Sequence, residues 1–363
     1  MLNIGILDTM NLVKRNVYSY IKDGIEEIDE TIVIDSILTN ILNKLKETIF
    51  DLRLDCLILA NDNGTNKRAK SIYSEYKANR NKNKTLTEEE KEQSIIYYII
   101  ETLKTLPFPY LEVRNTEADT IIYHLCKRFN DNIKDNIKIY IISTDTDMYQ
   151  MINNNIVCYN MYDKKEVNNS NWIDKLLKDE TNNIDNLYIQ DYVLMKSIVG
   201  DNSDNIKGIK GLGWKKTIKY FYVLRKYIKD IFENHYKLSK TIESYILENP
   251  VDDKKEEELL TKFYISLNEN EAILTRNMKL MDLSQLETST LFEIVKIIDN
   301  MFLQEYIFKE EEFKEYMRFD RWYYNDESLD TELSKMHRKY LSNFNKYSNK
   351  INKTIKELKD VIV

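Results

Sequence analysis

Three short apolar runs that each end in an aspartate constrain the fold of this chain more than any other feature. The runs are residues 4–7 before Asp8, residues 56–60 before Asp62 and residues 137–143 before Asp145. Helical patterns separate them, and long crossovers between buried strands indicate a mostly parallel sheet with helices on both faces, hence an α/β fold class. Because ligands bind beyond the carboxyl ends of such strands, we expect the three aspartates to converge on one edge.

Further acidic residues follow in pairs along the chain. The pairs are Glu117 with Asp119, Asp145 with Asp147, and Asp201 with Asp204. Taken singly, each acid is explained as well by a helix N-cap or a turn as by function. With Asp8 and Asp62 the set comprises eight carboxylates, which would repel one another and raise their pKa values without a cation between them. The joint pattern therefore predicts a divalent metal site, and oxygen ligands favour Mg²⁺ or Mn²⁺.

Paired metal ions of this kind are suited to one reaction. Two ions about 4 Å apart activate a water molecule and neutralise both the attacking and the leaving oxygen, which favours phosphodiester hydrolysis. The Asp-x-Asp motif at 145–147 is also typical of haloacid-dehalogenase-type phosphatases, in which one aspartate is the nucleophile. That alternative is disfavoured because the motif comes third along the sheet and Asp8 lacks the second aspartate of that signature.

The overall charge argues at first against a nucleic-acid partner. The chain has 363 residues and a net charge of −7, whereas nucleic-acid binders usually carry excess positive charge. The eight carboxylates of the predicted site account for this deficit, because the 53 basic residues against the other 52 acids would leave +1. The length predicts one large domain with a smaller one or an extension.

Cysteine usage and apolar runs indicate the compartment. Cys56, Cys126 and Cys158 lie far apart in apolar sequence without CxxC spacing, which predicts buried thiols rather than disulfides or zinc ligands. No apolar run approaches the roughly 20 residues that cross a membrane, so we expect no membrane partner. We expect a reducing intracellular location: a bacterial or phage-infected cytoplasm, or a parasite organelle if a targeting segment has been trimmed.

A basic segment follows Asp62 directly. Residues 67–84 contain one acid and seven cations, which are Lys67, Arg68, Lys70, Lys77, Arg80, Lys82 and Lys84. A solvated helix face is the plain alternative, but this run begins at the mouth of the predicted metal site. On a helix Tyr76 and Arg80 would share a side, with Lys77 one turn from Arg80. We expect the tyrosine ring to stack on a base while the two cations engage a phosphate.

A second basic segment is rich in glycine. Four of the seven glycines fall within 14 residues, interspersed with lysines: Gly200, Gly208, Gly211 and Gly213 with Lys207, Lys210, Lys215, Lys216 and Lys219. Glycine lets backbone N–H groups approach a phosphate closely, and the N-terminus of a following helix favours an anion. A purely structural turn is the alternative. We expect phosphate contacts here that do not read sequence.

The end of the chain has the pattern of one long amphipathic helix over residues 331–363. Its apolar residues recur at spacings of three and four: Leu333, Met336, Tyr340, Phe344, Tyr347, Ile351, Ile355, Leu358 and Ile362. We expect this face to dock on the body of the protein. Binding of a replication partner or of flanking DNA is the alternative.

Together these motifs resemble the 5′-nuclease superfamily in order and spacing. The matching segments are residues 6–12, 62–64, 75–80, 116–119, 142–148, 199–213 and 276–283. The sequence is similar to bacteriophage-type flap endonucleases (5′-3′ exonucleases) and to the 5′-nuclease domain of bacterial DNA polymerase I. The resemblance implies a PIN-like α/β core over 1–190, with a helical arch at about 66–97. A helix-hairpin-helix DNA-binding region over 191–310 and a helical extension over 311–363 would follow.

The resemblance also implies roles for the residues. Asp8, Asp62, Glu117 and Asp119 would hold a first metal ion, and Asp145, Asp147, Asp201 and Asp204 a second. Lys77 and Arg80 would stabilise the transition state, and the glycine-rich segment would bind K⁺. Bacterial members often have an aspartate where this chain has Thr120, so we expect altered metal affinity there.

The implied substrate is DNA with 5′-flaps, 5′-overhangs or free 5′-ends, with RNA primers as a second class, cut by a monomer to a 5′-phosphate and a 3′-hydroxyl. Two rivals stay open. One is a catalytically weak structure-specific DNA-binding paralogue, and the other is an RNA-cleaving PIN-type nuclease.

Overall fold

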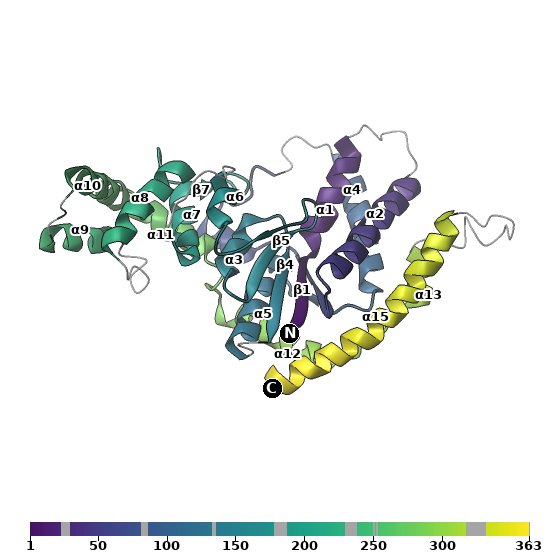
Figure 1. Cartoon of the computed structure of the whole chain (residues 1–363). Helices are drawn as coiled ribbons and strands as arrows, with labels where there is room; N and C mark the ends of the chain where they lie inside the picture. The colour runs from purple at the N-terminus through teal and green to yellow at the C-terminus, as the bar shows by residue number, and fades with distance from the viewer. Residues whose placement is uncertain are drawn as a thin grey trace.

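A six-stranded sheet in the order β3-β2-β1-β4-β5-β6 forms the centre of the computed structural model (Figure 1). The structure describes residues 1–22, 30–80, 86–132, 136–177, 187–228, 238–249, 251, 253–316 and 332–362. The strands are β1 (Leu2–Asp8), β2 (Cys56–Asn61), β3 (Tyr110–Glu112), β4 (Ile137–Ile142), β5 (Ile156–Asn160) and β6 (Lys165–Val167). Only β6 runs antiparallel to its neighbour, so the predicted mostly parallel sheet is confirmed.

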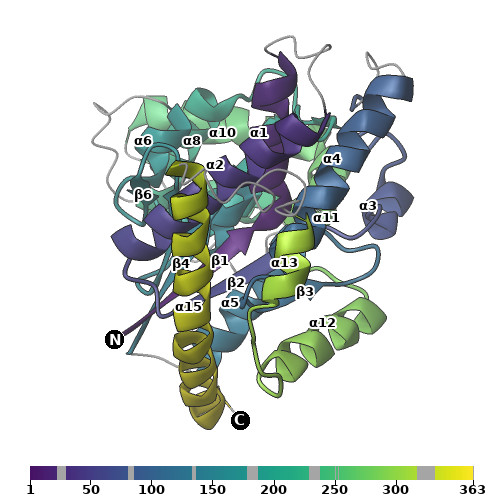
Figure 2. The same ribbon diagram turned by 90° about the vertical axis from the view of Figure 1, so that its right-hand side faces the viewer.

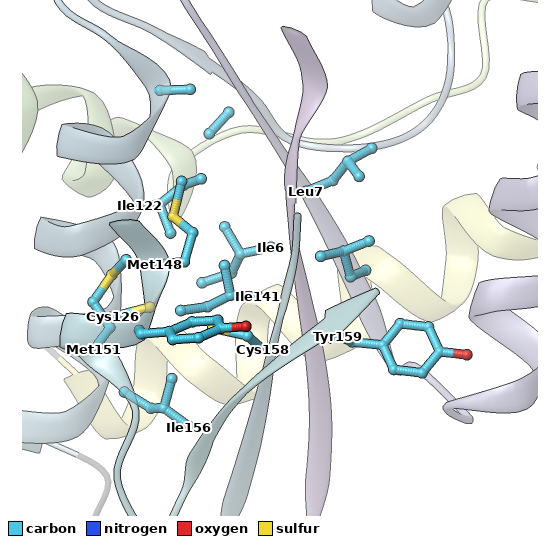
Figure 3. Packing of buried hydrophobic residues seen from close by; sticks show 14 of the residues in the cluster. Ile6, Leu7, Ile122, Cys126, Ile141, Met148, Met151, Ile156, Cys158 and Tyr159 are labelled. Carbon is cyan, nitrogen blue, oxygen red and sulfur yellow. The ribbon is translucent and has the colours of Figure 1, made fainter. Parts of the chain in front are cut away.

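Helices cover both faces of the sheet. On one face α1 (Thr9–Lys22), α2 (Glu30–Asp51) and α4 (Leu86–Lys104) pack against one another, and α5 (Ala118–Asn132) covers the other. Because side chains alternate along a strand, Ile6 of β1 points toward Ile122 of α5 while Leu7 points to the opposite face (Figure 3). Both are at most 1% exposed, so β1 is the two-sided apolar strand that a covered parallel sheet needs.

The three cysteines lie in this core. Cys56, Cys126 and Cys158 are each buried and unpaired as free thiols. Burial raises the pKa of the Cys56 and Cys126 thiols, so they stay protonated. The prediction of buried thiols is therefore confirmed.

The described part of the chain after residue 187 is helical apart from one small hairpin. The elements are α7 (Tyr192–Val199), β7 (Gly200–Asp201), β8 (Ile206–Lys207), α8 (Trp214–Tyr227), α9 (Leu238–Glu248), α10 (Lys254–Glu269), α11 (Glu271–Met281), α12 (Thr288–Met301) and α13 (Glu310–Tyr316). Helices α8, α9 and α10 project away from the sheet in Figure 1. The chain then returns to the sheet. Helix α11 packs on α7, and α12 packs on α5 and β3.

The last helix, α15 (Glu332–Ile362), packs along the body (Figures 1 and 2). Its apolar side chains Phe344, Ile351, Ile355 and Leu358 are at most 3% exposed. The Lys350 ammonium donates to the carbonyl of Leu54, at 2.8 Å, just before β2 begins. The predicted docking is confirmed for the described part of the helix, which lies at the amino-terminal end of the strands. In the described parts of the chain, each helix is too short or too polar to cross a membrane.

Candidate metal centre

The carboxyl ends of β1 and β4 position the first carboxylates. Asp8 is the last residue of β1, and its two oxygens accept hydrogen bonds from the Asn11 backbone N–H (3.0 Å) and the Ser143 hydroxyl (3.1 Å). Asp145 follows β4 and caps a short 3₁₀ turn, Thr146–Met151, by accepting from the Asp147 N–H at 2.9 Å. Both side chains therefore have fixed orientations at the predicted edge.

The N-terminus of α5 brings in the next carboxylates. Asp62, just after β2, accepts a 2.9 Å hydrogen bond from the Ala118 N–H at the first residue of this helix. That contact holds Glu117 and Asp119 beside Asp62. These three acids line a hollow of about 550 Å³ together with Asp8 and Asp145.

The remaining acids line an adjoining hollow of about 260 Å³. Asp147, Asp201 and Asp204 share its wall with Glu117 and Asp119, which also line the first hollow. Asp201 and Asp204 come from the β7–β8 hairpin, where the Asp201 carboxylate accepts from the Ser203 N–H at 2.8 Å. The structure thus brings all eight predicted carboxylates around two adjoining hollows.

Crowding and burial disfavour ionisation of several of these acids. Burial, with Asp62 nearby, raises the pKa of Asp8 to about 7. Burial and the charge of Glu117 raise the pKa of Asp119 well above its usual range, and burial also raises that of Asp145. Such carboxylates need positive charge close by if they are to be ionised near neutral pH.

Basic side chains supply part of that charge. Lys77 contacts Glu117 and lies 3.6 Å from Asp204, whose other oxygen accepts a 2.7 Å bond from Arg80. Lys196 of α7 contacts Asp147 and lies 2.8 Å from Asp201. Burial alone would raise the pKa of Asp201, but Lys196 and the hydrogen bonds from Ser203 lower it to about 2.

Lys196 is a site residue that the sequence reasoning missed. It lies in the apolar helix α7, and its side chain is only 5% exposed. The one available signal was a single lysine inside a helix whose other residues are almost all apolar. Because a buried ammonium needs a partner, that signal predicts a nearby carboxylate but does not say which one.

The donor set fits a divalent ion. All eight donors are carboxylates, which hard cations prefer, and several have pKa values that a bound cation would lower. Among the described residues, no three acidic, histidine or cysteine side chains surround one point as ligands of a single ion. The ammonium groups of Lys77 and Lys196 contact oxygens of four of the eight acids, namely Glu117, Asp204, Asp147 and Asp201.

The segment with Tyr76, Lys77 and Arg80 does not form a regular helix. The prediction that Tyr76 and Arg80 share one side of a helix is therefore wrong. Residues 74–80 form successive turns, and Lys77 has a φ of +55°. The Tyr76 ring is only 6% exposed, and its hydroxyl donates to Glu117 at 2.9 Å. The prediction that this ring stacks on a base is wrong for this conformation, because Ala69, Ile206 and Met281 bury it.

The basic residues around this segment have different environments. Lys67 and Lys70, on the short helix α3 (Lys67–Ile72), are exposed. Arg68 donates to the carbonyl of Lys279 at 2.8 Å. Lys82 and Lys84 lie outside the described residues, so their predicted DNA contacts stay predictions.

Thr120 contacts the acid beside it. It is 5% exposed, and its hydroxyl donates to the Asp119 carboxylate at 3.1 Å. A hydroxyl donor stabilises the ionised form of Asp119 but adds no charged ligand. The change in metal affinity at this position stays a prediction.

The glycine-rich segment has the special backbone that its composition predicts. A Cβ on Gly208 would lie 2.0 Å from the Val199 carbonyl oxygen, and one on Gly200 would lie 2.3 Å from the Gly208 nitrogen. Gly211 has a φ of +81°, and Gly213 is the N-cap of α8. The lysines here are exposed: Lys207, Lys210, Lys215, Lys216 and Lys219.

Comparison with known proteins identifies the family. Residues 3–177 match the model of the 5′-3′ exonuclease N-terminal resolvase-like domain. A 5′-3′ exonuclease of Mycoplasma pneumoniae is 30% identical over 219 residues, which cover 58% of this chain and 68% of the relative. The chain belongs to the 5′-3′ exonuclease family. Its members are nucleases, so this chain is a hydrolase, as its motifs predict.

Other members extend the comparison. The flap endonuclease of Escherichia phage T5 is 27% identical over 219 residues, or 58% of this chain and 62% of that enzyme. A solved complex of the T5 D15 flap endonuclease with DNA and metal ions has a TM-score of 0.59 at 20% identity, covering 83% of this chain and 100% of the other. The likeness confirms the predicted fold of the 5′-3′ exonuclease family.

Proposed function

We propose that this chain is a divalent-metal-dependent 5′-nuclease that cuts DNA at 5′-flaps, 5′-overhangs and free 5′-ends, leaving a 5′-phosphate and a 3′-hydroxyl. The observation that carries the proposal is the gathering of eight carboxylates, several with raised pKa values, around two adjoining hollows. Two Mg²⁺ or Mn²⁺ ions held there would activate water and neutralise both oxygens in line with the phosphorus.

The protein's own side chains hold and balance this charge. Asn11 and Ser143 fix the Asp8 carboxylate, and Ala118 fixes Asp62, so these ligands are oriented before anything binds. Burial alone would lower the pKa of Lys77, but the charges of Glu117 and Asp204 together raise it, so its ammonium stays protonated. When a substrate phosphate enters, Lys77 and Arg80 transfer from the carboxylates to the phosphate oxygens and stabilise the added charge of the transition state.

The exposed lysines of the glycine-rich segment would hold the duplex. Lys207, Lys210, Lys215 and Lys216 stand beside the N-terminus of α8, where backbone N–H groups favour an anion. Contacts to phosphate alone read no sequence, in keeping with recognition of a junction. K⁺ binding at this segment, action on RNA primers and a monomeric state are part of the same proposal.

The test is cleavage of a labelled 5′-flap by the purified protein. Mg²⁺ should give short products, and EDTA should abolish them. Asp145→Ala should reduce the rate by a factor of about 10³ or more while DNA affinity stays similar, because it removes a metal ligand and not a phosphate contact. Asp131→Ala, an exposed acid at the end of α5, is the matched control and should leave the rate unchanged.

Each alternative has its own outcome in this assay. Cleavage that Asp145→Ala leaves unchanged would contradict the site assignment. Tight flap binding without turnover in Mg²⁺ or Mn²⁺ would favour the catalytically weak DNA-binding paralogue. Faster cleavage of an RNA flap than of the matching DNA flap would favour the RNA-cleaving rival.

A further inference from the structure

The turn that presents Lys77 and Arg80 is fastened to the loop that holds Asp201 and Asp204. The Lys77 N–H donates to the Asp204 carbonyl at 2.9 Å. The Asn79 amide donates to the Asn202 carbonyl at 3.0 Å, and the Asn205 amide donates to the Glu75 carbonyl at 2.8 Å. We call these three hydrogen bonds the clamp. They join backbone to backbone and amide to backbone, so they need no ionised group.

A small apolar cluster supports the clamp from behind. Ala69 and Tyr76 pack with Ile206 of β8 and Met281 of α11, in a cluster separate from the main core. Tyr76 precedes Lys77, and Ile206 follows Asn205 directly. The turn and the hairpin therefore contact each other through buried side chains as well as through the clamp.

An arginine extends this connection to the duplex-binding segment. The Arg276 guanidinium lies 4.4 Å from the Tyr73 ring centroid, over its face, and it donates to the Lys207 carbonyl at 2.9 Å. Lys207 begins the exposed basic segment that continues to Lys219 in α8. Direct contacts thus join the turn at residues 74–80, the loop at residues 201–205 and the basic segment that begins at Lys207. We call these three parts the assembly.

Two residues of the assembly hold unusual backbone conformations. Lys77 has a φ of +55° and Asn205 a φ of +58°, in a region that side chains with a Cβ adopt rarely, although asparagine tolerates it. Such a conformation persists when the surrounding contacts fix it. The hydrogen bond from the Lys77 N–H to the Asp204 carbonyl fixes the first conformation. The hydrogen bond from the Asn205 side-chain amide to the Glu75 carbonyl fixes the second.

We propose that Asn205, assisted by Asn79, is a positioning residue that orients Lys77 and Arg80 over the carboxylates. It touches no reacting atom in this assignment and acts through the backbone of the turn. Because Asn205 is two residues from Lys207, a duplex held by the basic segment fixes the same loop that fixes the catalytic cations. This inference rests on the proposed function.

Two substitutions at Asn205 distinguish the role of its side-chain amide from that of its backbone conformation. Asn205→Gly keeps the left-handed φ available and removes the side chain, and Asn205→Asp keeps the shape and loses the donor. In Mg²⁺, the single-turnover rate on a 5′-flap should fall about tenfold in both, the effect of losing one well-placed hydrogen bond. The flap dissociation constant, measured in EDTA, should stay within about twofold, because no phosphate contact is lost.

The matched control loses the same kind of bond elsewhere. The Asn171 amide donates to the carbonyl of Glu166 at 3.0 Å, on β6 at the edge of the sheet. Asn171→Asp should change neither rate nor affinity. Asn79→Ala, on the exposed side of the turn, should lower the rate in the same direction as the Asn205 variants and by a smaller factor.

A double-mutant cycle shows whether Asn205 acts through the catalytic cations. In a Lys77→Ala, Arg80→Ala background, Asn205→Gly should change the rate by less than about twofold, since coupled residues give non-additive effects. A full tenfold loss in that background would overturn the proposal.

The outcomes also distinguish this inference from the function on which it rests. A wild-type chain that binds flaps but never cuts them overturns the proposed function and this inference with it. A wild-type chain that cuts flaps, while both Asn205 variants cut at the same rate, overturns the inference alone.

Discussion

Asp8 carries the clearest electrostatic consequence at the scale of single residues. Its pKa of about 7, raised by burial and by Asp62, compares with 3.8 for an ordinary aspartate. The folded protein therefore holds this proton more tightly than the unfolded chain does. Stability from this group is present below about pH 4 and is lost as the pH rises through about 7.

Asp8→Asn should reveal that penalty. In EDTA at pH 8 the variant should melt at a higher temperature than the wild type, because it removes an ionised carboxylate from a buried, acidic site. The difference should shrink as the pH is lowered from 7 to 4, and saturating Mg²⁺ should reverse its sign, since the ion stabilises only the ionised ligand. Scanning calorimetry across this range checks it, and a difference independent of pH would contradict it.

Strand ends made the acids predictable, and other site residues were less so. Asp8 and Asp145 follow apolar runs, so their convergence needed only the sheet. The partners of Lys196 could not be predicted, because nothing along the chain indicates that this lysine meets Asp147 and Asp201 from two other segments. The orientation of Tyr76 differs from the one that helical spacing predicts, because Lys77 has a positive φ and the segment does not form a regular helix.

At the scale of elements, the β7–β8 hairpin depends on close backbone contact between Gly200 and Gly208. A Cβ on Gly208 would lie 2.0 Å from a carbonyl oxygen, whereas one on Gly213 has nothing within 4 Å among the described residues. Gly208→Ala should therefore lower the free energy of unfolding by about 1–3 kcal/mol, because backbone must shift to admit the methyl group. Gly213→Ala should cost less than about 1 kcal/mol, the loss expected at an N-cap.

Urea denaturation of both variants checks this pair. Equal losses of stability would mean that the tight approach at Gly208 is not a feature of the hairpin in solution. Wild-type stability of Gly208→Ala would contradict the described backbone outright.

Long elements followed from pattern more readily than short ones. The strands β1, β2 and β4 and the helix α15 have sustained apolar periodicity, and each was predicted. The β7 and β8 strands have two residues each, too few for any period to register. The turns at 74–80 are set by contacts with residues 201–205, more than 120 positions away, which local sequence does not contain.

At the scale of the whole molecule, basic residues lie at opposite ends of the structure. The lysines of the glycine-rich segment adjoin the carboxylates, whereas those of α15 lie near the amino-terminal end of the sheet. Duplex affinity should fall steeply with salt, and Lys215→Ala or Lys216→Ala should each reduce the log–log slope by about 1. Lys346→Ala, on the exposed face of α15, should leave that slope unchanged. Fluorescence anisotropy over a salt series measures the slope. If Lys346→Ala reduced the slope as much as Lys215→Ala or Lys216→Ala does, the proposed path of the duplex would be contradicted.

The central claim is that folding gathers the carboxylates around two adjoining hollows that bind divalent ions. Titration of Mn²⁺ into metal-free protein, followed by electron paramagnetic resonance, tests it most directly because it counts bound ions without relying on catalysis. The account predicts two ions per wild-type chain, and fewer when Asp145→Ala is combined with Asp201→Ala. Failure to bind Mn²⁺ at millimolar concentration, or the same number of ions in that variant, would contradict it.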